Sequence, residues 1–338
     1  MRMYLATAVI LAACGGGDDG DSPTTATWQL LASDQPSSLL AVWAPTTSDV
    51  WVVGGKEGSA GKPPIWHYDG SAWSRLDPGA SGGVDTTSVD LWQVFGFEGG
   101  PVFIGGSNGT ILRYENNAFT KVTTPSAGVT FGLWGASADD VWAVGGAASG
   151  GNAFVWHYTG TQFDAVSGIP ADITGNVWKV TGRAANDVYM SASNGYVLHW
   201  NGSALSGELV GTEAENLFSI GCGATRCVTA GGNGTNGVLY ENDGSAWTSR
   251  VPTEDGPVWR GVTPTGDNTY VVGQLGTVLC YDGGSYVPDV HALTTKTLHA
   301  AWSNVDGDLF TVGGRFDSVP TTDGVLLYKG TSTIAPLP

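Results

Sequence analysis

The feature that most constrains the fold of this chain is an internal repeat. Residues 133–146 read LWGASADDVWAVGG, and residues 42–55 read VWAPTTSDVWVVGG. Weaker copies recur along the chain. Each copy has an apolar strand, a second strand that ends in glycines, a third strand, a tight turn and a fourth strand. The third strands lie in residues 65–70, 111–116, 155–160, 197–202, 238–243, 278–283 and 325–330. Such a repeat predicts an array of similar antiparallel units.

The spacing of the copies predicts a β-propeller. The first strands begin at Leu40, Trp92, Phe131, Trp178, Phe218, Trp259 and His299. Four strands in about 40–45 residues is the size of a propeller blade. A single blade cannot bury both of its faces, so the copies must stack around an axis. We therefore predict an all-β, seven-bladed propeller over residues 26–338, with four-stranded antiparallel blades that begin near residues 39, 90, 130, 176, 216, 257 and 297.

The two ends of the propeller are expected to meet. The segment ATWQLL (26–31) has the pattern of an outer strand without a blade, whereas the last copy ends in the weaker segment TSTI (331–334). We predict that the N-terminal strand around Trp28 is the outer strand of the seventh blade and closes the ring.

The first residues have the pattern of an export signal. Arg2 precedes an apolar run (3–13) that is too short to span a bilayer. The run ends in LAAC (11–14), which resembles the lipobox of bacterial lipoproteins. That resemblance implies a signal peptide at residues 1–13 and a lipid on Cys14 that anchors the protein in the bacterial cell envelope.

The residues after Cys14 have the composition of a flexible tether, which extends to residue 25. Gly15 resembles the outer-membrane sorting pattern of the lipoprotein family, so an outer-membrane location is expected. The alternative is an ordinary secretory signal with an incidental cysteine.

The charge of the chain excludes two classes of partner. It has 14 Lys and Arg against 31 Asp and Glu, a formal net charge of −17. Phosphate contacts need clustered basic residues, so we expect no nucleic-acid partner. Adhesion to anionic headgroups needs a polybasic patch, so membrane contact is expected only through the lipid. The propeller is expected to be monomeric.

Two cysteines lie close together in the sequence. Cys222 and Cys227 bracket the segment GATR, and an oxidising compartment would permit a disulfide between them. A buried pair of thiols is the alternative. The cysteine spacing does not match a zinc site, so no metal and no cofactor are predicted from it.

Three repeats share an aspartate before the second strand and a histidine in the third strand. The pairs are Asp49 with His67, Asp140 with His157, and Asp187 with His199. Equivalent positions of different blades are too far apart for one metal site. Within a blade, the start of strand two lies beside the end of strand three. We predict Asp–His hydrogen bonds that fix the turn, similar to the structural pair of WD-repeat propellers.

Three repeats begin with a tryptophan that is followed by a long polar residue. These polar residues are Gln93, Lys179 and Arg260. Because first strands line the axial channel of a propeller, the three side chains are expected to reach it. There they are either solvated or converge on an anion.

One face of the propeller is expected to collect the loops between strands two and three and the loops between blades. It would carry the glycine-rich segments 54–64 and 313–324, which favour adaptable binding loops. It would also carry the acids Asp85, Asp172, Glu213, Glu215, Glu254 and Asp255. Their spacing does not match an EF-hand, so they are expected to be solvated, with Ca²⁺ binding as the alternative.

Over residues 26–334 the repeats resemble those of bacterial propeller lipoproteins. They also resemble the wider superfamily of sialidase-type, WD-repeat-like and photosystem-assembly-factor propellers. The segments that carry this resemblance are DVWAVGG (140–146), GQLGTVL (273–279) and YDGSAW (68–73). Sialidases carry SxDxGxTW boxes and an arginine triad, and neither pattern is visible here. The resemblance therefore implies a fold and no activity.

Two functions of different class are compatible with the sequence. The first is a lipid-anchored scaffold or binding module of the envelope, which recognises a protein or glycan through the loop face without catalytic residues. The second is a carbohydrate-active enzyme, a hydrolase or lyase, in which two carboxylates about 5–10 Å apart flank a glycosidic bond. Its candidate acids are Asp85, Glu213 and Glu254. The lack of a paired acid–base motif favours binding.

Overall fold

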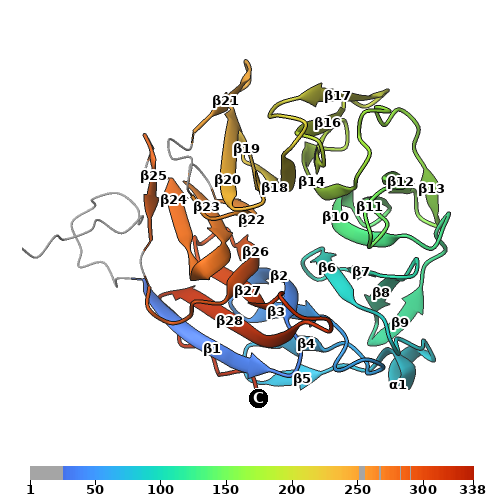
Figure 1. Cartoon of the computed structure of the whole chain (residues 1–338). Helices are drawn as coiled ribbons and strands as arrows, with labels where there is room; N and C mark the ends of the chain where they lie inside the picture. Colours follow the sequence, from blue (N-terminus) through green and yellow to red (C-terminus); the bar gives the residue numbers. More distant parts are fainter. Residues whose placement is uncertain (1–25, 251–255, 266–267, 282, 290) are drawn as a thin grey trace, which may run out of the picture.

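The computed structural model describes residues 26–250, 256–265, 268–281, 283–289 and 291–338. Within these ranges the chain forms seven four-stranded antiparallel sheets around a central axis (Figure 1). The predicted all-β, seven-bladed propeller is therefore confirmed. Cys14, Glu254 and Asp255 lie outside the described residues.

Each blade runs outward from the axis in four strands. The innermost strands are β2 (Leu39–Thr46), β6 (Leu91–Gly96), β10 (Val129–Ser137), β14 (Val177–Ala184), β18 (Asn216–Cys222), β22 (Trp259–Thr265) and β26 (Thr297–Ser303). The second strands are β3 (Asp49–Gly54), β7 (Val102–Gly106), β11 (Asp140–Gly146), β15 (Asp187–Ala192), β19 (Cys227–Asn233), β23 (Asn268–Gly273) and β27 (Leu309–Arg315).

The outer half of each blade is less regular in length. The third strands are β4 (Ile65–Tyr68), β8 (Ile111–Glu115), β12 (Phe154–Tyr158), β16 (Tyr196–Trp200), β20 (Asn236–Asn242), β24 (Val278–Tyr281) and β28 (Thr322–Gly330). The outer strands are β5 (Trp73–Arg75), β9 (Ala118–Lys121), β13 (Phe163–Ala165), β17 (Leu205–Leu209), β21 (Trp247–Ser249), β25 (Tyr286–Pro288) and β1 (Thr27–Gln35).

Helical structure is confined to two short segments of the described residues, α1 (Pro78–Gly82) and the 3₁₀ turn η1 (Gln274–Gly276). Asp77 caps α1 by accepting a hydrogen bond from the backbone of Gly79. Within the described ranges, no helix has the length and apolar character needed to cross a membrane.

The ring closes as the sequence predicts. The seventh sheet has the order β1-β28-β27-β26, so the N-terminal strand is its outer strand (Figure 1). The indole of Trp28 donates a hydrogen bond to Asp289 of blade six at 3.2 Å. The residues after β28 form no strand, but they pack beneath the closure, and the backbone N–H of Leu337 donates to the carbonyl of Leu31 at 2.7 Å.

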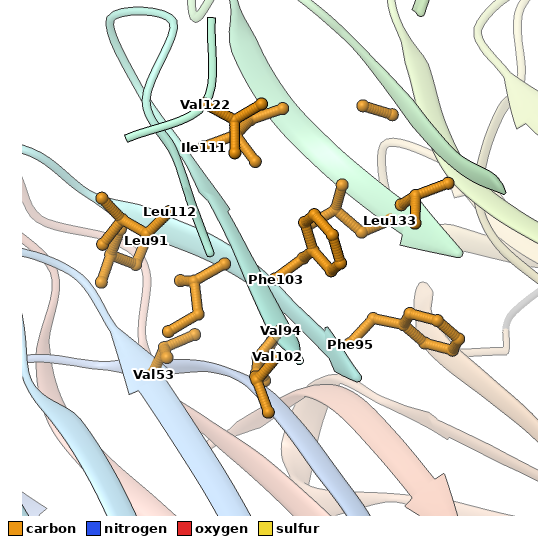
Figure 2. Close-up of a cluster of buried hydrophobic side chains, with 14 of the residues drawn as sticks. Val53, Leu91, Val94, Phe95, Val102, Phe103, Ile111, Leu112, Val122 and Leu133 are labelled. Carbon is orange, nitrogen blue, oxygen red and sulfur yellow. The ribbon is translucent and has the colours of Figure 1, made fainter. Parts of the chain in front are cut away.

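The core lies between neighbouring blades. The second strands are apolar on both faces because each blade is covered on both sides, and β11 is buried almost throughout. Figure 2 shows Val53, Leu91, Phe103 and Leu133 of the first three blades in one cluster, and all four are at most 2 % exposed. Burial of each such side chain stabilises the fold by about 1.5–3 kcal/mol.

Candidate functional site

Every innermost strand departs from regular pairing close to its first residue. In β14, Val177 and Lys179 pair with consecutive residues of β15, so Trp178 is an extra residue. Such a β-bulge turns the extra side chain out of the regular ladder. The extra residues are Leu40, Trp92, Phe131, Trp178, Arg260 and His299, and in blade five the bulge spans Leu217 and Phe218.

Blade six differs from the alignment of the repeats. That alignment matches Trp259 with Trp92 and Trp178, and it matches Arg260 with the polar residues that follow them. In the structure Arg260 is itself the bulged residue, and Trp259 is only 3 % exposed. Gln93 and Lys179 follow the bulge, whereas Arg260 occupies it, because the pairing in β22 is shifted by one residue.

The bulged residues, apart from the buried Leu40 and Leu217, line a cavity of about 740 Å³ on the propeller axis, which we call the axial cavity. Its walls include Ser107, Ala148 and Gln274, which belong to loops between strands two and three. The axial cavity is therefore the centre of the loop face. A smaller cavity of about 100 Å³ lies further along the innermost strands, and Lys179 and Arg260 line both.

Aromatic rings surround most of the axial cavity and form what we call the aromatic collar. In order around the axis, the collar consists of Phe218, Trp178, Phe131, Trp92, His299 and Phe316. Successive ring centroids are 5.2, 5.0, 5.4, 5.8 and 5.1 Å apart. Aromatic pairs at such distances stabilise one another. The collar is therefore a preformed apolar wall.

Lys179 lies where the axial cavity meets the smaller cavity and lines both. Its ammonium donates one hydrogen bond to the amide oxygen of Gln93 and another, of 2.8 Å, to the backbone oxygen of Phe131. Gly132 lets β10 lie close to β14 at this point, since a Cβ there would sit 2.9 Å from the Cα of Lys179. Burial lowers the pKa of Lys179 to about 7, so its charge is easily changed near neutral pH.

Arg260 contributes the second cation of the cavity. The centre of its guanidinium lies 4.1 Å from the ring centroid of Phe218, a cation–π contact that fixes the side chain. Burial lowers the pKa of Arg260, but an arginine side chain still stays protonated in proteins.

His299 is a neutral member of the collar. Its Nδ1 lies 2.8 Å from the carbonyl oxygen of Leu40. A carbonyl only accepts hydrogen bonds, so Nδ1 carries the proton. Burial, together with the nearby charges of Lys179 and Arg260, lowers the pKa of His299 to about 3, although the bond to Leu40 opposes this shift.

The charged residues at the rim of the cavity are paired with one another. The ammonium of Lys56 lies 2.8 Å from a carboxylate oxygen of Asp90. The Nε of Arg315 lies 3.1 Å from a carboxylate oxygen of Asp323, and the ammonium of Lys296 pairs with the carboxylate of Asp34. The rim therefore contributes little net charge.

The predicted acids of the loop face do not meet at the axial cavity. Asp85 accepts a hydrogen bond of 2.8 Å from the backbone of Thr87, which is a local turn. Asp172 and Glu215 accept hydrogen bonds from tyrosines, at 3.2 and 2.9 Å. None of these three, nor the exposed Glu213, lines the cavity. Within the described ranges, no three His, Cys, Asp or Glu side chains gather as ligands of a metal ion.

The three Asp–His pairs lie on the opposite face of the propeller. The Asp–His distances are 2.9 Å for Asp49 and His67, 2.5 Å for Asp140 and His157, and 2.8 Å for Asp187 and His199. In each blade the histidine also stacks on the aromatic residue directly opposite in strand two, with centroids 4.2 Å apart. The role of these pairs in fixing the turn remains a prediction.

The two neighbouring cysteines are brought together by the strand pairing. Cys222 ends β18 and Cys227 begins β19, directly opposite each other, and their sulfurs are bonded. This bridge is remote from the axial cavity, because it lies at the other end of the innermost strand.

Comparison with known proteins supports the fold and goes no further. No protein-family model matches the chain, and no curated protein matches it either. A streptogramin B lyase structure is similar, with a TM-score of 0.67 and 11% identity over 91% of this chain and 99% of that chain. The structure of YCF48 bound to a D1 peptide has a TM-score of 0.66 and 16% identity, and the match covers 90% of this chain and 97% of that chain. The structure of the RRP9 WD40 repeats has a TM-score of 0.68 and 11% identity, and the match covers 89% of this chain and 96% of that chain. The chain is thus similar in fold to a lyase, to a peptide-bound protein and to WD40 repeats, all at low identity.

Proposed function

We propose that this chain is a scaffold or binding module of the bacterial cell envelope that recognises a protein or glycan partner through its loop face, without catalysis. The aromatic collar carries this proposal. It is a preformed apolar wall with two cations, at the centre of the face on which the loops gather. Concave, mostly apolar sites with a few polar groups are typical of ligand binding.

Two of the structural neighbours make a binding role reasonable for a propeller of this outline. YCF48 was solved bound to a D1 peptide, and RRP9 contributes WD40 repeats. At such low identity these proteins do not identify the partner of this chain. The YCF48 structure shows that a protein of similar fold can hold a peptide.

A hydrolase or lyase is less well supported. One neighbour is a lyase, so the fold also serves enzymes. However, Asp85, Asp172 and Glu215 are each hydrogen bonded away from the axial cavity. The acid Asp90, which does line the cavity, is paired with Lys56. The other acid that lines the axial cavity, Asp317, lies 4.0 Å from Arg315, so neither of the two cavity acids is free of a cation to act in a carboxylate pair.

The envelope location and the lipid anchor form part of the proposal. They are supported by the segment LAAC and by the tether-like residues after Cys14, all outside the described residues. A lipid on Cys14 would hold the propeller at a membrane surface, with residues 14–25 as a flexible connection.

The test is a crosslinked pull-down from an envelope extract, with the full-length chain carrying a C-terminal tag. Trp178→Ala removes part of the collar. Trp200→Ala is the matched control, because it removes a half-buried tryptophan from the same blade without touching the axial cavity. A partner recovered by the wild type and the control, but lost with Trp178→Ala, supports the proposal. Equal recovery by all three proteins would refute the loop-face assignment. Release of reducing ends from a glycan panel would favour the enzyme.

A further inference from the structure

Two cations of the axial cavity lack an acidic partner. Every lysine and arginine in the described part of the chain has a carboxylate oxygen within 4.0 Å, except Lys121, Lys179 and Arg260. Lys121 is exposed on an outer strand, where water solvates its charge. Lys179 and Arg260 instead face the same cavity. This is unexpected in a chain with 31 acids and only 14 basic residues.

Both cations are partly desolvated, and neither is neutralised by the protein. Burial lowers the pKa of Lys179 to about 7 and also lowers the pKa of Arg260. A buried charge without a partner is unfavourable, so an anion from outside would stabilise the site. The acids that line the rim do not supply it, because Asp90 is paired with Lys56, and Asp317 is exposed beside Arg315.

The donors of both cations are available to such an anion. The guanidinium of Arg260 lies over the ring of Phe218, 4.1 Å from its centroid, and makes no hydrogen bond within the described residues. An arginine can then offer two parallel N–H groups to a carboxylate. An ammonium has three donors, and Lys179 uses two of them on Gln93 and Phe131. One N–H of Lys179 is left for a ligand.

The surroundings define the remainder of the ligand. The cavity of about 740 Å³ is much larger than a carboxylate group, and the aromatic collar forms a continuous part of its wall. Its neutral His299 adds no positive charge, and the chain as a whole is strongly negative. Multiply charged anions are therefore disfavoured relative to a single carboxylate on an apolar body.

We propose that the axial cavity binds a carboxylate carried by an aromatic or aliphatic group, with the carboxylate on Arg260 and Lys179 and the apolar group against the aromatic collar. The proposal rests on the proposed function and gives the chemical class that the loop face recognises. Two sources supply this chemistry, a small aromatic acid and the free C-terminus of a peptide that ends in an apolar residue.

The experiment compares ligands that differ only at the carboxylate. Hexapeptides ending in Phe or Leu, as the free acid and as the C-terminal amide, are titrated calorimetrically into the full-length protein at pH 6.5. Benzoate, inorganic phosphate and glucuronate are the other probes. We expect the free acid to bind at least about tenfold more tightly than the amide, since charge-assisted hydrogen bonds are lost in the amide. Benzoate alone binds if the source is a small acid.

Variants assign the preference to the two cations. Lys179→Met and Arg260→Met keep the bulk of each side chain and remove its charge, and the acid-to-amide ratio is expected to fall towards one in each. Lys121→Met, which removes the exposed unpaired cation, is expected to keep the wild-type ratio. Circular dichroism confirms that each variant is folded.

A second readout is proton uptake. If the carboxylate binds beside Lys179, binding at pH 8 raises the pKa of that ammonium and takes up a fraction of a proton. Calorimetry in buffers of different ionisation enthalpy measures this uptake, and Lys179→Met abolishes it. The other charged or titratable groups facing the cavity are Arg260, His299, Asp90, Lys296, Arg315 and Asp317, and all of them remain in that variant.

Several results would overturn the carboxylate assignment: equal binding of acid and amide, no binding of any carboxylate probe, or tighter binding of phosphate or glucuronate. None of these results by itself would contradict the proposed function. A partner lost with Trp178→Ala but retained by Lys179→Met and Arg260→Met shows that the loop face binds without the carboxylate.

Discussion

The ammonium of Lys179 donates a hydrogen bond to the side-chain amide oxygen of Gln93, two blades away, and another to the backbone oxygen of Phe131 in the blade between them. This contact places an ionisable group at the base of a cavity that the aromatic collar lines. Strand pairing links residues only within a blade, so this bond connects parts of the ring that share no ladder.

The charge of Lys179 should make the stability of the protein depend on pH. Its pKa is lowered by burial from 10.5 to about 7, so the unfavourable burial of the charge is fully present below pH 7 and is lost as the pH rises to above 10.5. Lys179→Met should raise the free energy of unfolding by about 1–2 kcal/mol at pH 6, after allowance for water in the cavity and the lost hydrogen bonds. The gain should shrink at pH 10. Urea unfolding at both values tests this, and an identical difference at both would contradict it. Lys121→Met should leave the free energy of unfolding unchanged at both pH values.

The closure of the ring by β1 predicts different effects on stability for substitutions at two neighbouring leucines. Leu31 is 3 % exposed and belongs to the core beneath the closure, whereas Leu30 is 39 % exposed. Leu31→Ala should lower the free energy of unfolding by about 2–4 kcal/mol. Leu30→Ala, one residue away and facing outward, should change it by less than about 0.5 kcal/mol. Denaturant titration measures both, and similar losses would argue against the observed register of β1.

The Asp–His pairs should matter for stability and not for ligands. Asp140→Asn weakens the hydrogen bond to His157 and should lower the free energy of unfolding by about 1–2 kcal/mol. The neighbouring Asp139 is exposed, so Asp139→Asn serves as the control. Peptide affinity should be unchanged in both, because the pair lies on the face opposite the axial cavity. A loss of affinity in folded Asp140→Asn would mean that the two faces are coupled.

Removal of the bridge between Cys222 and Cys227 should have a modest effect. The bond closes a short loop, so it restricts the unfolded chain only slightly, and Cys222→Ala with Cys227→Ala should cost about 2 kcal/mol. Thermal unfolding with and without reductant measures this. The loss of stability that reductant causes by breaking this bridge should be seen in the wild type and be absent from the double variant.

The predicted lipid anchor has a direct assay. Cells grown with labelled palmitate should incorporate the label into the wild-type chain, and the protein should partition into detergent. Cys14→Ser should abolish both. A soluble, unlabelled wild-type protein would instead indicate an ordinary secretory signal.

Much of the fold could be predicted because its determinants are local. Glycine in turns with positive φ, such as Gly70 and Gly202, marks the hairpins between third and fourth strands. The unpaired segment around Trp28 predicts the closure, because an outer strand must pair somewhere. These features depend on residues close in the sequence or on a simple count of strands.

The candidate site could be predicted only in part. The first-strand residues Lys179, Gln93 and Arg260 are visible as polar positions at the axis. The bulge in β22, however, shifts Arg260 by one position relative to the other two, and a repeat alignment cannot detect a shift in pairing. The collar also needs Phe316, which lies in the loop between β27 and β28, and its contact with His299 cannot be seen in the repeat pattern.

The bulges have a further consequence for how such a protein can change over evolutionary time. Each extra residue lies outside the hydrogen-bonded ladder, so its side chain can be exchanged without altering the register of the strands. In the blades whose bulged residue lines the axial cavity, a single substitution then changes one sector of the binding surface. A library randomised at these positions would sample new specificities on an unchanged scaffold, and the same freedom explains how a ring of similar blades can carry a ligand site without any sevenfold symmetry.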